Sequence, residues 1–237
     1  MAGDSEPARG PGPHAPDGSP VELYALLPPG PEVPLLCAAL PPGSRVLELG
    51  CGAGRVTRPL VAHGCRVVAV DESPEMLAHV RDVTPTVRAD IRRLDLAERF
   101  DGVVLGSHLV NTPDPGRRAA LLAACRRHVA DGGVVLVQRH DPGLGEEDTG
   151  TTVRAGPVAI TLRSVRRDGD RLSATVAYTA GARAWTHTFT AEVLDEETLR
   201  GCLGAAGLRP RRWLDAGRQW LEAVPGRGRA PGAPTVE

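Results

Sequence analysis

The sequence predicts an α/β fold in which a doubly wound, mostly parallel seven-stranded sheet carries helices on both faces. Short apolar runs alternate with helical patterns up to about residue 138, and this order is typical of a parallel sheet. A period of two residues then takes over in residues 152–193, which indicates an antiparallel element inserted after the fifth strand. The length of 237 residues suits one such domain with an elaboration.

The first strand and helix are marked by a change from apolar residues to glycines. Residues 45–49 form an apolar run that ends in glycines, which is typical of a buried parallel strand. A helix is expected from about residue 54 to 62 and should end at Gly64. Residues 65–70 then predict a second buried strand, which Asp71 follows directly.

Ser73 predicts the start of the next helix, because serine is a favoured N-cap residue. Pro74 suits the first helical position, and Glu75 lies near the positive end of the helix dipole. The third and fourth strands are expected at residues 86–89 and 102–106.

The remaining elements of the main sheet lie on either side of the insertion. Residues 117–129 carry apolar residues at helical spacing, and residues 131–133 predict a turn into a fifth strand at residues 134–137. Two last strands, at residues 211–214 and 220–224, are expected to complete the sheet.

The insertion is expected to hold three antiparallel strands within residues 152–193. Asp168 and Gly169 lie between two alternating runs, which is a hairpin signal. Two roles stay open for this element: it forms a wall or lid of the substrate site, or its apolar face simply packs on the domain. After it, Asp195 should cap a helix that ends at Gly207.

Both ends of the chain are rich in proline and glycine and poor in apolar side chains. Residues 1–20 and 225–237 are therefore predicted to be disordered, because they cannot bury enough surface to offset their loss of entropy. The domain proper is expected to span residues 21–224.

Composition disfavours several classes of function. The formal net charge is -1 and aromatic residues make up 3%, which argues against nucleic acid and membrane surfaces as partners. The five cysteines are scattered, without a C-x-x-C pair, which argues against a disulfide framework and a metal site and favours a cytoplasmic location. The sequence also has neither a signal-peptide core nor an apolar run of the roughly 18 residues that a membrane helix needs.

Three alternate glycines, Gly50, Gly52 and Gly54, directly follow the first strand. Glycine lets the backbone approach a ligand closely, and the helix that follows presents free N–H groups. The fingerprint of NAD-binding enzymes requires G-x-G-x-x-G, but Arg55 or Thr57 stands at the third glycine position. The motif therefore disfavours an NAD-dependent dehydrogenase.

Two acidic residues lie where neighbouring strands end. Asp71 follows the second strand and Asp90 follows the third, so both should lie at the carboxyl edge of the sheet, beside the glycine loop. A carboxylate at this place can accept hydrogen bonds from both hydroxyls of a ribose.

Together these residues resemble the class I S-adenosylmethionine-dependent methyltransferases. The match comprises the glycine motif that begins at Glu48, the acid at Asp71, the Ala89-Asp90 pair, and residues 100–105 and 126–133. The resemblance implies S-adenosyl-L-methionine as cofactor, with its methionine part over the glycines, its ribose at Asp71 and its adenine near Asp90. The cofactor-binding residues implied in this way are Glu48, Gly50, Cys51, Gly52, Gly54, Asp71, Glu72, Met76, Asp90, Ile91 and Ser107.

The sulfonium of this cofactor is already a good electrophile, so catalysis mainly requires positioning of the acceptor. A general base helps only where the acceptor starts protonated. His108 and His140 follow the fourth and fifth strands and are the candidate catalytic residues, although each could instead hydrogen-bond a loop. Tyr24 and Trp185 are candidates for lining the substrate site, and core packing is the alternative for both.

The function that we expect is methyl transfer to a small-molecule acceptor, with nitrogen or oxygen favoured over carbon. The alternative is a non-methylating protein of the same fold that binds S-adenosylmethionine or S-adenosylhomocysteine. A nucleic-acid methyltransferase is disfavoured, because the stretch after the fourth strand lacks an Asp/Asn-Pro-Pro-aromatic motif. The sequence leaves monomer and homodimer open.

Overall fold

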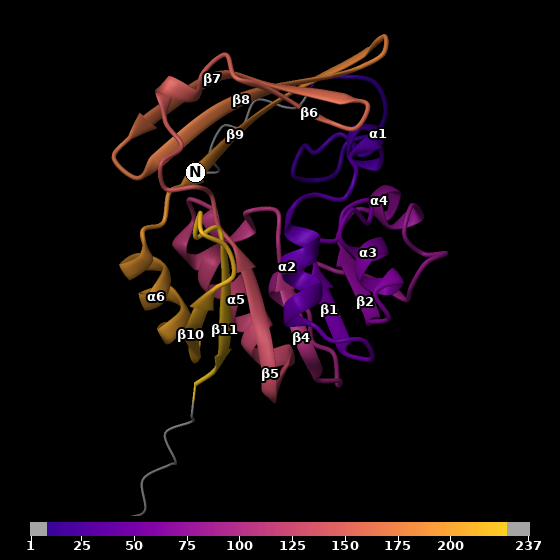
Figure 1. Cartoon of the computed structure of the whole chain (residues 1–237), viewed down its shortest axis with the longest axis vertical. Helices are drawn as coiled ribbons and strands as arrows, with labels where there is room; N and C mark the ends of the chain where they lie inside the picture. The colour runs from indigo at the N-terminus through magenta and orange to yellow at the C-terminus, as the bar shows by residue number, and fades with distance from the viewer. Residues whose placement is uncertain (1–8, 227–237) are drawn as a thin grey trace, which may run out of the picture.

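Residues 9–226 are described by a computed structural model, in which they form a seven-stranded sheet and a four-stranded sheet (Figure 1). The elements follow one another as α1 (Val21–Leu26), α2 (Glu32–Ala39), β1 (Arg45–Leu49), α3 (Thr57–Ala62), β2 (Arg66–Asp71), α4 (Pro74–Ala78), β3 (Thr86–Arg88), η1 (Ile91–Arg93), β4 (Phe100–Leu105), η2 (Leu109–Asn111), α5 (Pro115–His128), β5 (Val129–Gln138), η3 (Glu146–Asp148), β6 (Thr152–Ala155), β7 (Val158–Asp168), β8 (Arg171–Ala180), β9 (Arg183–Glu192), α6 (Glu196–Ala205), β10 (Leu208–Trp213) and β11 (Trp220–Pro225).

The predicted α/β fold is confirmed. The larger sheet has the strand order β10-β11-β5-β4-β1-β2-β3, with β1 through β5 parallel and β11 antiparallel to both of its neighbours. Successive residues of β1 enter different cores: Val46 packs toward α2 and α3, and Leu47 packs toward α5 and α6. The chain order reverses between β1 and β4, and ligands of open α/β sheets bind at such a switch point.

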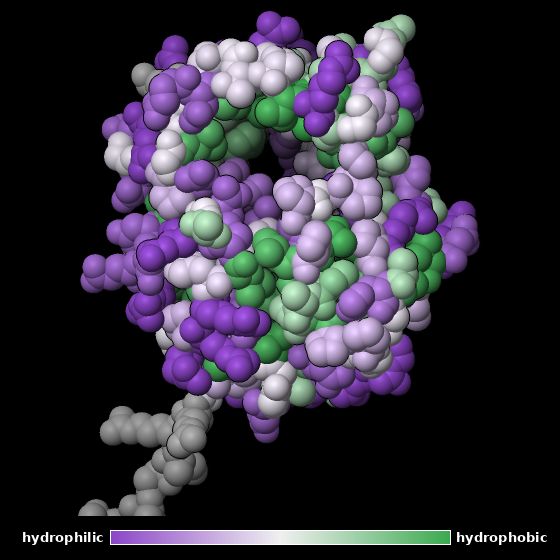
Figure 2. Space-filling view, viewed as in Figure 1, coloured by the Kyte–Doolittle hydropathy of each residue, from purple (hydrophilic) through white to green (hydrophobic). Residues whose placement is uncertain are grey.

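The insertion contains four antiparallel strands, in the order β6-β7-β8-β9, where the sequence predicted three. The additional strand is β6, whose four residues are too few to show a clear alternation. The predicted hairpin is confirmed, because β7 and β8 pair on either side of Gly169, which has a φ of +57°. The smaller sheet lies across one end of the larger one (Figure 1), and a deep hollow separates the two (Figure 2).

The start of the fifth strand differs from the prediction. We expected a turn at residues 131–133, but β5 runs from Val129 to Gln138 without interruption. The register against β4 instead shifts between Phe100 and Gly102, so the extra residues are accommodated within the strand. By contrast, the predicted caps Ser73 and Asp195 accept backbone N–H groups from the first turns of α4 and α6.

The head of the chain also differs from the prediction, because residues 9–20 have defined partners. Arg9 and Thr186 exchange two backbone hydrogen bonds of 2.9 and 2.8 Å, which adds the head to β9, the edge strand of the smaller sheet. Trp185 Nε1 donates to the carbonyl of Pro11 at 2.9 Å. An edge strand offers free backbone groups, and these order a segment that has little apolar surface of its own. Residues 1–8 of the predicted disordered head, and residues 227–237 of the predicted tail, lie outside the described residues.

Within residues 9–226, no helix combines the length and the apolar character needed to cross a membrane. All five cysteines are free thiols, and Cys51, Cys65 and Cys125 are buried.

Candidate functional site

The glycine loop after β1 has the backbone conformation that its sequence predicts. Gly50, Gly52 and Gly54 have φ values of +73°, +52° and +88°, a region that other residues rarely adopt. A side chain at Gly50 would come within 2.8 Å of Leu109 Cδ1, and one at Gly54 within 2.9 Å of Val80 Cγ2. A residue other than glycine would therefore be strained at these positions. Leu109 and Val80 also leave no room for a side chain at Gly50 and Gly54.

Asp71 at the end of β2 contacts this loop directly. Its Oδ2 accepts the N–H of Gly52 and its Oδ1 accepts the N–H of Ser73, each at 2.9 Å. A carboxylate has about four acceptor positions, so about two remain for a ligand. Burial raises the pKa of Asp71, and the two backbone N–H groups oppose this shift. The structure thus brings the predicted acid and the predicted loop together.

Glu48 lies buried between the end of β1 and the start of α3. Thr57 Oγ1 donates to its Oε2 at 2.6 Å. Burial raises the pKa of Glu48 to about 7. Burial also raises the pKa of the Cys51 thiol far above its usual range, which keeps that thiol neutral. Thr57 was missed as a site residue, because sequence reasoning treated it only as a position where a glycine was lacking.

The side of the loop assigned to adenine is apolar. Met76 is buried, and its Sδ would lie 3.9 Å from a side chain at Gly52. Ile91 Cδ1 would lie 3.8 Å from a side chain at Gly50. Both residues therefore border the loop, and their contact with an adenine stays a prediction.

The two other acids of this region, Asp90 and Glu72, have surroundings that differ from those of Asp71. Asp90 caps η1 and forms a salt bridge of 2.6 Å with Arg92, whose hydrogen bonds lower the pKa of the carboxyl group. Any ligand at Asp90 would share the carboxylate with Arg92. The side chain of Glu72 is exposed.

The two candidate histidines meet at the carboxyl edge of the sheet. The rings of His108 and His140 stack with their centroids 4.1 Å apart and 3° between their planes. The ring of Phe189 on β9 continues the stack at 5.6 Å from His140. Burial lowers the pKa of His108 well below its usual value and lowers the pKa of His140 to about 4, so both rings are neutral at pH 7.

Tyr24 and Trp185 have different surroundings. Tyr24 Cδ1 would lie 3.8 Å from a side chain at Gly52, so α1 covers the loop, and burial raises the pKa of the phenol. Trp185 is 1% exposed and packs with Leu23 of α1 and Val158 of β7. Trp185 therefore fastens the head to the smaller sheet, whereas Phe189 is the aromatic residue of β9 that reaches the histidines.

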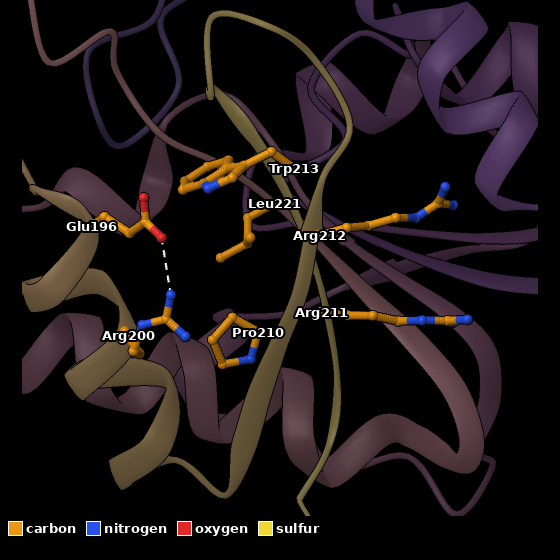
Figure 3. A pocket seen from close by; sticks show the side chains of 7 residues that line it. All are labelled: Glu196, Arg200, Pro210, Arg211, Arg212, Trp213 and Leu221. Carbon is orange, nitrogen blue, oxygen red and sulfur yellow. Dashed lines mark hydrogen bonds and ion pairs between the residues drawn. The ribbon is translucent and has the colours of Figure 1, made fainter.

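A small pocket of about 110 Å³ lies elsewhere, between α6 and β10 (Figure 3). Arg200 and Glu196 of α6 lie on one side of it and form an ion pair with a nitrogen–oxygen distance of 2.9 Å. Because β10 is the edge strand opposite β3, this pocket is separate from the glycine loop. Its lining consists of Glu196, Arg200, Pro210, Arg211, Arg212, Trp213 and Leu221.

Comparison with known proteins points to one group. A family model described as a methyltransferase domain matches residues 46–133. A ubiquinone biosynthesis O-methyltransferase of Hahella chejuensis is 37% identical over 99 residues, which are 38% of this chain and 40% of that protein. A ribosomal RNA small subunit methyltransferase A of Thermosynechococcus vestitus is 34% identical over 112 residues, 44% of this chain and 42% of that protein. The chain thus spans less than half the length of these relatives.

Solved structures match over more of the chain. The CcbJ methyltransferase of Streptomyces caelestis has a TM-score of 0.69 and 22% identity, covering 87% of this chain and 96% of that one. The sugar N-methyltransferase KedS8 of a Streptoalloteichus species has a TM-score of 0.64 and 23% identity, covering 87% of both chains. At this level of identity the two likenesses establish the fold alone.

Proposed function

We propose that the chain is a class I, Rossmann-like S-adenosylmethionine-dependent methyltransferase, which transfers the methyl group of S-adenosyl-L-methionine to a small-molecule acceptor. The observation that carries this proposal is the contact between Asp71 and the glycine loop. The carboxylate is held by two backbone N–H groups and keeps acceptor positions for the two hydroxyls of a ribose.

The residues around the loop fit the cofactor. The backbone of Gly50, Gly52 and Gly54 would pass under its methionine part, where the lack of side chains permits close approach. Met76 and Ile91 would border the adenine, whose amino group would share Asp90 with Arg92. When bound, the cofactor supplies an electrophilic methyl group on a positively charged sulfur.

On the acceptor side, His108 and His140 would orient the acceptor atom through their neutral ring nitrogens. A base whose pKa is about 4 withdraws protons weakly, so we assign the larger share of catalysis to positioning. Nitrogen or oxygen is favoured over carbon as the accepting atom, because both hydrogen-bond to an imidazole. The hollow between the two sheets would hold the acceptor and limit its contact with water (Figure 2).

The test is calorimetric binding of S-adenosylhomocysteine, with NAD as the negative ligand. Replacing Asp71 by Ala removes two charge-assisted hydrogen bonds at about 1.5–3 kcal/mol each, so we expect affinity to fall by at least about 100-fold. Asp168→Ala at the exposed β7–β8 turn is the matched control and should leave binding unchanged. Equal affinities of wild type and Asp71→Ala would contradict the assignment of the site.

Turnover separates the proposal from its alternative, a non-methylating protein that binds the same cofactor. Release of S-adenosylhomocysteine is measured with panels of small amines, phenols and alcohols, and with RNA as a macromolecular comparison. Release with a small-molecule panel supports methyl transfer. Tight binding without release in any panel favours the alternative.

A further inference from the structure

Asn111 occupies an unusual place in this chain. It is the sole asparagine among 237 residues, and it lies 1% exposed in the short helix η2, directly after His108. A buried amide side chain costs free energy unless its donors and acceptor are satisfied. The partners of Asn111 therefore show what the residue does.

Each end of this amide bonds a different part of the molecule. Its Oδ1 accepts the backbone N–H of His140 at 2.9 Å, and its Nδ2 donates to the backbone carbonyl of Glu192 at 2.7 Å. The orientation of the amide is settled by chemistry, because an N–H group can only donate and a carbonyl can only accept. One side chain thus joins the loop of His140, the helix after His108 and the end of β9.

The loop that Asn111 stabilises is strained. Ser107 and His108 are consecutive non-glycine residues with φ values of +51° and +56°. Such conformations cost free energy and persist only where surrounding contacts enforce them. Ser107 N–H donates to Gln138 Oε1 at 2.8 Å, and Asn111 N–H donates to the carbonyl of His108 at 2.9 Å.

Arg118 on α5 belongs to the same hydrogen-bond network. Its Nε donates to the carbonyl of Val110 at 2.9 Å and its Nη2 to that of Thr112 at 2.6 Å. The same guanidinium forms a salt bridge of 2.8 Å with Glu192 on β9. The backbone on both sides of Asn111 is therefore fixed to α5 and to the smaller sheet.

We propose that Asn111 is a positioning residue, which holds the imidazoles of His108 and His140 in their stack and locks the smaller sheet against them. The proposal rests on the proposed function, because that function makes the methyl acceptor the group that the stacked rings orient. Asn111 itself acts through backbone groups, the N–H of His140 and the carbonyl of Glu192. Without it, the N–H of His140 would lose its partner, and the loop would have to open toward water to regain one.

The test follows the ring titrations of the histidines by NMR, with His108→Gln and His140→Gln for assignment. In the wild type, His140 should protonate near its pKa of about 4. In Asn111→Ala, opening of the loop should hydrate the imidazole of His140. The midpoint of its titration should then rise by about one pH unit or more, toward the ordinary pKa of about 6.5. The charged group that also acts on His108 is Arg55, which pairs with Glu32 and is unchanged in the variant.

A matched control has the same kind of buried bond far from the stack. His128 is fully buried, and its Nε2 accepts the N–H of Leu96 at 3.0 Å. His128→Ala should destabilise the fold but leave the titration of His140 unchanged, which separates positioning from general loss of stability. If Asn111→Ala does not fold, Asn111→Ser is measured instead, because its shorter side chain cannot reach both partners.

The outcomes are distinct. A raised His140 midpoint in the Asn111 variant, with S-adenosylhomocysteine affinity within about threefold of wild type, supports the positioning role. An unchanged midpoint in a folded Asn111 variant overturns it, as does an equal rise in His128→Ala. Failure of the wild type to bind S-adenosylhomocysteine would overturn the proposed function instead, and the titration would still decide the role of Asn111.

Discussion

At the scale of single residues, Glu48 is a carboxyl group that the fold holds away from water. Its carboxyl group is buried, accepts a hydrogen bond from Thr57, and has a pKa raised to about 7 by loss of solvation. In the unfolded chain the same group titrates near 4.5. Glu48 therefore binds its proton more tightly in the folded state than in the unfolded state.

This difference makes stability depend on pH. The contribution is fully present below about pH 4.5 and is lost as the pH rises through about 7. The loss amounts to on the order of 3 kcal/mol for a shift of this size. In Glu48→Gln, whose amide oxygen still accepts from Thr57, the free energy of unfolding should fall less between pH 5 and 8 than in wild type. Urea unfolding at both pH values measures this, and parallel pH profiles would contradict the protonation of Glu48.

At the scale of elements, the head and β9 depend on each other. Gly10 lies where the head crosses Trp185, with a φ of +152°, and a side chain there would come within 2.2 Å of Trp185 Cδ1. The head therefore fits against this strand only where residue 10 has no side chain. Its docking covers an edge strand that would otherwise offer its backbone to other chains.

Gly10→Ala should therefore release the head from β9. The amide of Thr186 donates to Arg9 at 2.8 Å, and its hydrogen exchange should become at least about tenfold faster, which corresponds to about 1.4 kcal/mol of local stability. Gly132→Ala is the matched control, because a side chain there meets open space. Unchanged exchange at Thr186 in Gly10→Ala would show that the head tolerates the added methyl group.

At the scale of the whole molecule, the two sheets meet around the hollow, and the proposed cofactor site lies on the larger one. A ligand that binds the folded state alone stabilises it by about 2.7 kcal/mol at 100 times its dissociation constant. For a chain of this size, S-adenosylhomocysteine should raise the melting temperature by about 5–10 °C. NAD should leave it unchanged, and a similar shift with NAD would contradict the cofactor assignment.

The parts of the site that sequence predicts are those determined by neighbours in the chain. The glycine loop, Asp71 and the caps Ser73 and Asp195 follow from short motifs whose geometry is local. For the stack of His108 and His140, the sequence predicted only that both residues follow adjacent parallel strands. It did not predict the contact between their rings.

Other features depend on contacts between distant residues. Asn111 bonds a carbonyl 81 positions away, and Trp185 bonds one 174 positions away. No local pattern carries such a pairing, so the role of Asn111 and the order of the head were not predictable. Strand β6 was missed for a different reason, because a strand of four residues presents too little periodicity.

The distance between the head and its partner has a consequence for synthesis. The indole that bonds the carbonyl of Pro11 leaves the ribosome 174 residues after Pro11 itself. At translation rates of about 5–20 residues per second, that interval is about 10–35 s. The glycine loop and its strands can assemble during this time, but the head and α1 still lack β9 as a partner. A nascent chain would thus present its cofactor site uncovered until β9 emerges, and closure of the head would be among the last steps of folding.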